Sequence, residues 1–228
     1  MIIRGVKQIS DGVMEITPDS GSAFFLRIQY LSKVAPDKLV AVRNGLGEND
    51  SLFAEELSLA PNEPGVFTEE EWADILFASL SYSVECVAMT YLARAEHSRF
   101  LLSQKLAHKQ LPSEPCKVAL DFLEDSGALS DLRFATAWLR SRAISHAEGK
   151  KRLEVELYKR GVSRENAKIA LDDFFSFCDE DESCVRAYKK LYRKGIREEK
   201  KMRSSLLTLG FSSKRIERIF KEIQNGES

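Results

Sequence analysis

Two groups of acidic residues are the first candidates for chemistry in this chain of 228 residues. Asp172 and Asp173 are adjacent, and four further acids occupy positions 179–182. Paired carboxylates can hold a metal ion or act as general acid and base. Neighbouring positions of a helix point to different sides, however, so Asp172 and Asp173 do not make a pair. We interpret residues 179–182 as a solvated linker and predict no catalytic residue.

The cysteines and histidines do not form a recognisable site either. Cysteines stand at positions 86, 116, 178 and 184, without a Cys-x-x-Cys pair, and we interpret them as buried thiols. No two of the three histidines, at 97, 108 and 146, share a helical face. Phosphate-binding glycine loops and a Gly-x-Ser-x-Gly elbow are absent from the sequence. We therefore expect no metal, no cofactor and no enzymatic activity.

Basic residues are the remaining candidates, because the net charge of −1 hides a split along the chain. Residues 1–80 hold 6 Lys and Arg against 13 Asp and Glu, and the rest hold 28 against 22. Residues 183–228 alone hold 13 basic and 5 acidic side chains. Such a segment attracts a polyanion or an acidic protein surface, and a solvated helical face is the alternative. The candidate partner-binding residues are Arg133, Arg140, Arg142, Lys150, Lys151, Arg152, Lys189, Lys190, Arg193, Lys194, Arg197, Lys200, Lys201 and Arg203.

The cations at 150–152 open a predicted helix, where positive charge opposes the helix macrodipole. An anionic partner would explain them, and solvated flanks of the core are the alternative. Phe134 and Trp138 stand one helical turn apart, and so do Tyr188 and Tyr192. We expect all four rings in the core, and not as platforms on which nucleic-acid bases stack.

The elements that position these residues begin with a small β meander. Within residues 2–28, three short apolar stretches are separated by Asp11-Gly12 and by residues 18–21, both typical turn sequences. We expect residues 35–65 to be irregular, with one further short strand at 39–42. Apolar residues are 43% of the whole chain and charged residues 30%, which is typical of a globular protein.

Helical periodicity takes over at Thr68, where Thr68-Glu69-Glu70-Glu71 is a capping box, and continues to Ile223. A repeat of about fifty residues runs through it. Three leucines each precede an apolar residue by five positions at the turn into the next helix: Leu106 and Leu111, Leu157 and Val162, Leu206 and Phe211. Gly161 and Gly210 stand where a helix ends in a left-handed residue.

The predicted fold is therefore mainly α, with tandem three-helix repeats in an elongated array after a small β-rich start. The predicted divisions are an acidic β-rich region at 1–66, a connecting helix at 67–83, and repeats at 84–128, 130–178 and 183–225. Three units of ~20 Å helices would reach ~60 Å, which suits a filament or a groove. No apolar run long enough for a bilayer and no export signal is present, so we expect a cytoplasmic protein that spans no membrane.

Two segments resemble the bacterial RecX family. Residues 91–98 read Tyr-Leu-Ala-Arg-Ala-Glu-His-Ser, and residues 123–135 read Leu-Glu-Asp-Ser-Gly-Ala-Leu-Ser-Asp-Leu-Arg-Phe-Ala. The Asp-x-Arg-Phe-Ala stretch at 131–135, followed by Arg140-Ser141-Arg142, is the most distinctive part. The resemblance covers about residues 66–225, and the β-rich start is similar in kind to an extension that some members carry.

The resemblance implies a non-enzymatic regulator of the RecA recombinase in homologous recombination, DNA repair and the SOS response. Its implied partners are the RecA filament and single-stranded DNA, with double-stranded DNA as a further option. Such a protein lies in the filament groove and modulates ATP hydrolysis, strand exchange and filament stability, and we expect inhibition by a monomer. The alternative from the residues alone is a non-specific DNA-binding helical module that acts independently of RecA. From the charge split along the chain, we further expect the acidic first region to shield the basic repeats in the free protein or to contact another partner.

Overall fold

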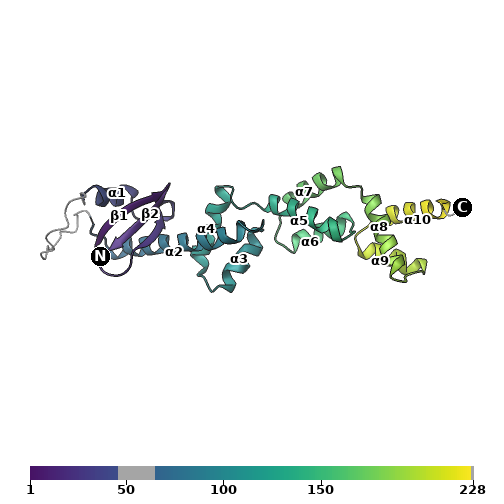
Figure 1. Cartoon of the computed structure of the whole chain (residues 1–228), viewed down its shortest axis with the longest axis horizontal. Coiled ribbons are helices and arrows are strands. Elements are labelled where there is room, and N and C mark those ends of the chain that lie inside the picture. The colour runs from purple at the N-terminus through teal and green to yellow at the C-terminus, as the bar shows by residue number, and fades with distance from the viewer. Residues whose placement is uncertain (46–64, 227–228) are drawn as a thin grey trace. The chain divides into compact units, whose positions relative to one another are not determined.

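The structure, a computed structural model, describes residues 1–45 and 65–226, with side chains described to residue 42 and from 65 to 223. It is mainly helical, with a three-stranded antiparallel sheet near the N-terminus, which confirms the predicted fold class (Figure 1). The chain forms two compact units, and each unit is built from two separate stretches of the chain. The first contains residues 1–93 and 103–128, and the second contains residues 94–102 and 129–228.

The sheet of the first unit is the predicted meander. It consists of β1 (Ile3–Ser10), β2 (Val13–Pro18) and β3 (Phe24–Arg27), in the order β1-β2-β3. The turn between β1 and β2 contains Gly12, whose φ of 68° lies in the left-handed region. Met14 pairs with Leu26 across the sheet, and both side chains are buried, so one face of the sheet is apolar.

Three helices and part of a fourth complete this unit. They are α1 (Pro36–Gly45), α2 (Glu69–Leu92), α4 (Ser113–Asp125) and the end of α3 (Arg99–His108), and a 3-10 turn, η1 (Ile28–Tyr30), follows β3. The predicted strand at 39–42 is wrong, because this stretch lies within α1. Pro36 suits a first helical position, and the buried Leu39 and Val42 are three residues apart, which is helical spacing. The prediction of an irregular stretch is also wrong for residues 36–45, which form α1, and most of its remainder falls on residues 46–64, outside the described part.

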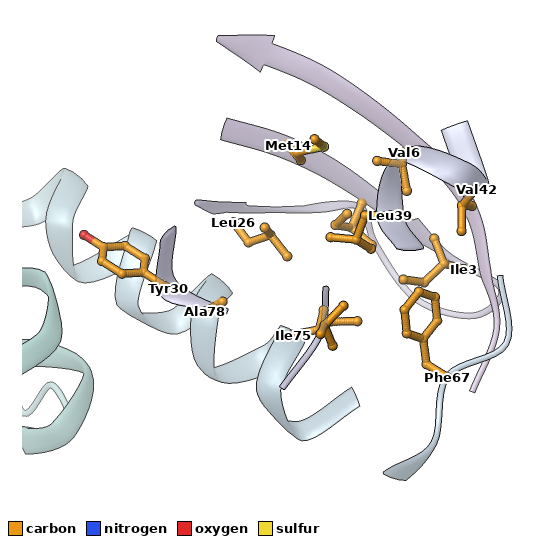
Figure 2. Packing of buried hydrophobic residues seen from close by; sticks show 12 residues of the cluster. Ile3, Val6, Met14, Leu26, Tyr30, Leu39, Val42, Phe67, Ile75 and Ala78 are labelled. Atoms are coloured by element: carbon orange, nitrogen blue, oxygen red, sulfur yellow. The ribbon is translucent and has the colours of Figure 1, made fainter. Parts of the chain in front are cut away.

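The apolar face of the sheet packs against α1 and α2 (Figure 2). Labelled side chains in this core are Ile3, Val6, Met14, Leu26, Tyr30, Leu39, Val42, Phe67, Ile75 and Ala78. The predicted capping box starts α2: the Glu71 amide donates to the Thr68 hydroxyl at 3.3 Å, and the Thr68 amide donates to the Glu71 carboxylate at 2.8 Å. By length and composition alone, α2 could also cross a bilayer, a test that core helices of globular units also pass, and no other described helix does so.

Two buried acids of α2 tie it to the end of β3 and to the segment that follows the sheet. Glu85 accepts hydrogen bonds from Arg27 at 2.5 and 2.7 Å and from the Tyr30 hydroxyl at 2.7 Å. Asp74 accepts the backbone N–H groups of residues 32–34 at 2.8 to 3.1 Å. Burial alone would raise the pKa of Asp74, but these hydrogen bonds outweigh it and the pKa lies below its usual value. The charges of these two buried acids are thus satisfied within the first unit.

The second unit contains two sets of three helices with separate cores. The first set is α5 (Asp131–Ser145), α6 (Lys150–Tyr158) and α7 (Arg164–Phe177), and the second is α8 (Glu180–Arg193), α9 (Glu199–Thr208) and α10 (Ser213–Gly226). Phe134 is buried in the first core, as predicted. Trp138 is half-buried and packs against the same core, and the guanidinium groups of Arg142 and Arg160 lie over its ring, at 5.5 and 4.5 Å from the centroid.

The repeat seen in the sequence corresponds to one recurring turn. Leu111, Val162 and Phe211 each donate a backbone hydrogen bond to the leucine five residues earlier, at 3.5, 3.2 and 3.3 Å. The residue before each donor is left-handed: Gln110 at φ 59°, Gly161 at 80° and Gly210 at 91°. This is the Schellman end of a helix, and it recurs after α3, α6 and α9; the same turn, with Gly195 at φ 92°, also follows α8. The recurrence supports three-helix repeats, but the exact boundaries stay a proposal, since α2 runs continuously through residue 84.

The cysteines differ in exposure. Cys116 and Cys184 are buried, as predicted, and burial raises the pKa of the Cys184 thiol to about 11. Cys178 is intermediate, and Cys86 is exposed, so the prediction of a buried thiol at position 86 is wrong. Cys86 follows the buried Glu85 and therefore points away from the core side of α2.

Candidate partner-binding surface

The fourteen predicted cations all belong to the second unit, where the structure divides them into two classes. The first class consists of cations that already have a partner within the unit, and two of them bind Glu148. Its side chain is 4% exposed and accepts hydrogen bonds from Arg142 at 2.7 and 3.1 Å and from Arg152 at 2.7 Å. Burial alone would raise the pKa of Glu148, but the two guanidinium groups outweigh it and hold the pKa below its usual value. Arg142 and Arg152 therefore hold the fold together and are not free to meet a partner.

Arg152 also connects the two helix sets of this unit. Its Nη1 donates to the Thr208 carbonyl oxygen at 3.0 Å, and the Gly149 amide donates to the Leu209 carbonyl at 2.8 Å. The backbones meet so closely that a Cβ at Gly149 would lie 2.5 Å from the Gly210 carbonyl. The start of α6 is thus seated directly on the turn between α9 and α10.

Residues 179–182 are not the predicted linker, because they begin α8. The Asp179 carboxylate caps this helix by accepting the Asp181 amide at 2.8 Å. Glu180 pairs with Arg215 of α10 at 3.0 Å and accepts the Lys150 amide at 2.9 Å. Asp181 pairs with Arg215 and with Arg218, which lies on α10 as well. These acids join α8, α10 and the start of α6.

The contact with Glu180 also bears on the cations at the start of α6, for which the sequence suggests an anionic partner. The Glu180 carboxylate lies at the N-terminus of α6, so this chain supplies the negative charge that the macrodipole favours. The Lys150 ammonium pairs with Asp172 at 2.6 Å, and both side chains are about half exposed. The charge of this helix start therefore does not by itself indicate an anionic partner.

Five more of the predicted cations have partners within the unit. Arg133 pairs with Glu96 at 2.9 Å, Lys190 donates to the Ser145 carbonyl at 3.3 Å, Arg197 lies over the Tyr192 ring at 3.5 Å, Lys201 pairs with Glu198 at 2.7 Å, and Arg203 pairs with Glu199 at 2.7 Å. Tyr188 packs in the core against Phe220, as predicted. The core prediction is wrong for Tyr192, which is 46% exposed and stacks on Tyr188.

The remaining six predicted cations form the second class, and we call them the free cations. They are Arg140, Lys151, Lys189, Arg193, Lys194 and Lys200. All six are exposed, and within residues 1–42 and 65–223 the structure gives none of their side chains an ion pair or a hydrogen bond. Four of them lie along α8 or between it and the first turn of α9: Lys189, Arg193, Lys194 and Lys200. Lys189 and Arg193 are one turn apart on α8. A charge without a local partner is available to an anionic one.

No sequence signal singles out Phe177, whose side chain is 82% exposed at the end of α7. It stands three residues after Phe174, the spacing of a buried stripe, so the pattern predicts a core position. The same unit exposes Ile144 by 83%, and here a signal exists, because Ile144 is five residues after the buried Leu139 and off the helical period. In the described part of the chain, no three His, Cys, Asp or Glu side chains are placed to hold a metal ion.

Comparison with known proteins gives relatives for both the sequence and the fold. A family model described as RecX, second three-helix domain, matches residues 130–171, which contain α5, α6 and most of α7. Regulatory protein RecX of Treponema pallidum (strain Nichols) is 38% identical over 128 residues, which are 56% of this chain and 78% of the relative. Regulatory protein RecX of Prosthecochloris aestuarii is 32% identical over 140 residues, 60% of this chain and 90% of the relative.

Two solved structures share the fold. A crystal structure of a regulatory protein RecX matches with a TM-score of 0.68 at 19% identity, over 96% of this chain and 98% of the other. The crystal structure of RecX from Lactobacillus salivarius matches with a TM-score of 0.55 at 23% identity, over 64% of this chain and 98% of the other. At these identities the two structures support the fold alone.

Proposed function

The chain belongs to the RecX family of regulatory proteins, and from this we propose that it binds the RecA filament on single-stranded DNA and inhibits it. Inhibition here means a lower ATPase rate, slower strand exchange and a less stable filament. In this proposal the protein is a cytoplasmic monomer that acts in recombination and DNA repair without catalysing a reaction or holding a cofactor.

The observation that carries the proposal is the set of free cations. A paired cation must break its ion pair before it binds a partner, whereas a free one exchanges only water and counterions. Lys189, Arg193, Lys194 and Lys200 are free, exposed and close together along the chain. Phosphates of DNA within the filament, or acidic side chains of its protein surface, would be attracted to them.

The rigidity of this unit supports the same conclusion. Glu148 and its two arginines, together with Glu180 and Arg215, fix the two helix sets around the free cations. A preorganised surface loses little entropy when it binds. A ligand that prefers one state of a filament shifts the filament toward that state, so inhibition requires binding and no catalysis.

A matched pair of variants tests the proposal. The first replaces three free lysines, Lys189, Lys194 and Lys200, with alanine. The second replaces three paired lysines, Lys150, Lys159 and Lys201, and thus removes the same charge from the same unit. The first should need about tenfold more protein to inhibit the DNA-dependent ATPase of the cognate RecA, and the second less than about twofold more.

Salt dependence separates this proposal from the DNA-binding module. Each lost phosphate contact should flatten the plot of log affinity against log salt by about 0.7 for single-stranded DNA. Equal effects of the two triple variants would contradict the role of the free cations. A wild-type protein that binds naked DNA in a salt-sensitive way, yet leaves the RecA ATPase and filament unchanged, would favour the DNA-binding module.

A further inference from the structure

Phe177 is an apolar side chain in an unusual place. It ends α7 with 82% of its surface exposed, although it lies only three residues from Phe174, which packs against the core of its helix set. Exposed aromatic side chains of this kind are enriched where proteins bind one another. Phe177 belongs to neither core of the second unit, so the fold does not account for its position.

An open groove of about 410 Å³ lies beside Phe177, between the ends of α5 and α7, and we call it the α5–α7 groove. Ala143, Phe174, Phe177 and Cys178 form its apolar walls. The volume accommodates more than one apolar side chain of a partner. All walls of the groove come from one helix set, namely from α5, from α7 and from the residue that follows α7.

Two charged residues line the same groove. Arg140 is one of the free cations, and the exposed Asp173 carboxylate likewise has no ion pair among the described residues. Next to them, the Arg186 guanidinium donates to the Ala143 carbonyl at 3.2 Å, which adds positive charge behind one wall. The groove therefore offers an apolar floor with both a cation and an anion at its rim.

This combination favours a protein segment over a nucleic acid. A polypeptide can place an apolar side chain against Phe174 and Phe177, an acidic side chain at Arg140 and an N–H donor at Asp173. A DNA backbone presents only negative phosphates, which Asp173 repels. An apolar centre surrounded by a polar rim is also the usual arrangement of a protein–protein hot spot.

We infer that the α5–α7 groove docks a segment of the recombinase protein itself, through an apolar side chain flanked by an acidic residue. The inference rests on the proposed function and adds to it a protein contact that is separate from the free cations on α8 and α9. In this arrangement the cations supply attraction and the groove supplies the recognition of the protein partner.

The first test compares Phe177→Ser with Ile169→Ser. Ile169 is a 48% exposed residue of the same helix that does not line the groove, so it is the matched control. Affinity is measured by fluorescence anisotropy for the cognate RecA filament on an oligo(dT) strand with a non-hydrolysable ATP analogue, and separately for the oligo(dT) strand alone. We expect Phe177→Ser to weaken filament binding at least about tenfold and to leave binding to the strand unchanged. Ile169→Ser should change neither affinity.

Two results would overturn the inference. If Phe177→Ser binds the filament as the wild type does, the groove is not a docking site. If it loses affinity for the naked strand by the same factor as for the filament, Phe177 stacks on DNA bases and the partner is a nucleic acid. A wild type that does not bind the filament at all refutes the proposed function first, and the inference with it, before any variant is compared.

A second measurement uses the unmodified protein. Cys178 lines the groove, whereas Cys86 is exposed on α2 and serves as an internal reference. Alkylation by iodoacetamide, followed by mass spectrometry, should be several times slower at Cys178 relative to Cys86 once the filament is bound. An unchanged ratio of the two rates would contradict docking in the groove, whatever the behaviour of the Phe177 variant.

Discussion

Arg152 donates a hydrogen bond of 2.7 Å from its Nε to the carboxylate of Glu148, whose side chain is 4% exposed. This bond gives Arg152 a role that its two neighbours do not have, although the three adjacent cations look equivalent in the sequence. Lys150 has an exposed ion pair with Asp172, Lys151 is free, and Arg152 joins the two helix sets of the second unit. Replacing all three at once would lower both the stability of the fold and the affinity for a partner. Variants should therefore replace either free cations or paired cations, and not both together.

Removing the charge of Glu148 should destabilise the second unit. Glu148→Gln leaves Arg142 and Arg152 half-buried without a carboxylate, and we expect a loss of about 2 kcal/mol in the free energy of unfolding. Glu198→Gln, which breaks an exposed pair with Lys201, is the control and should cost less than about 0.5 kcal/mol. Urea denaturation followed by circular dichroism measures both, and equal losses would refute a structural role for Glu148.

The same carboxylate predicts how stability depends on pH. The pKa of Glu148 is lower in the folded chain than its usual value of 4.5, because the two arginines outweigh the effect of burial. Its contribution is therefore fully present above that usual value and is lost as the pH falls through it toward the folded pKa. The difference in unfolding free energy between wild type and Glu148→Gln should be full at about pH 7 and smaller at about pH 3. A difference that stays constant across this range would contradict the assignment.

Gln110 occupies a left-handed turn position that glycine occupies in the other two repeats. A side chain is strained there, so Gln110→Gly should raise the free energy of unfolding by about 0.5 to 1 kcal/mol. Gly161→Ala should act in the opposite direction, because its Cβ would lie 2.2 Å from the Phe100 Cβ. Thermal unfolding of the two variants measures both effects, and a destabilised Gln110→Gly would show that the turns are not equivalent.

The two large aromatic residues of α5 should differ in their contribution. Phe134 is 7% exposed, and Phe134→Ala should cost about 3 to 5 kcal/mol through the lost contacts and the cavity left behind. Trp138 is half-buried, with the guanidinium groups of Arg142 and Arg160 over its ring, so Trp138→Ala should cost less, about 2 kcal/mol. Denaturant midpoints decide the order, and a larger loss at Trp138 would contradict it.

Much of the fold was predictable because it depends on local signals. The capping box at Thr68 fixes the start of α2, and the five-residue spacing from Leu157 to Val162 is the sequence mark of a Schellman turn. The strand predicted at 39–42 failed because a short apolar stretch fits either element, and only the three-residue spacing of Leu39 and Val42 favours the helix that is present.

The surface was less predictable because it depends on partners far apart in the sequence. Glu180 and Arg215 are 35 positions apart, so no local pattern shows that residues 179–182 belong to a helix start held by α10. Which cations are free is decided in the same way, by the carboxylates and carbonyl groups that fold back upon them. The exposure of Phe177 is likewise a property of the assembled helix set and not of the spacing within α7.

The measurement that tests the central claim most directly is the single-stranded-DNA-dependent ATPase rate of the cognate RecA, with this protein titrated from well below to equal stoichiometry and DNA in excess. The account predicts that the rate falls at substoichiometric amounts, because the protein acts on the filament and not on free DNA. An ATPase rate and a filament stability that do not change, together with salt-sensitive binding to naked DNA, would contradict it.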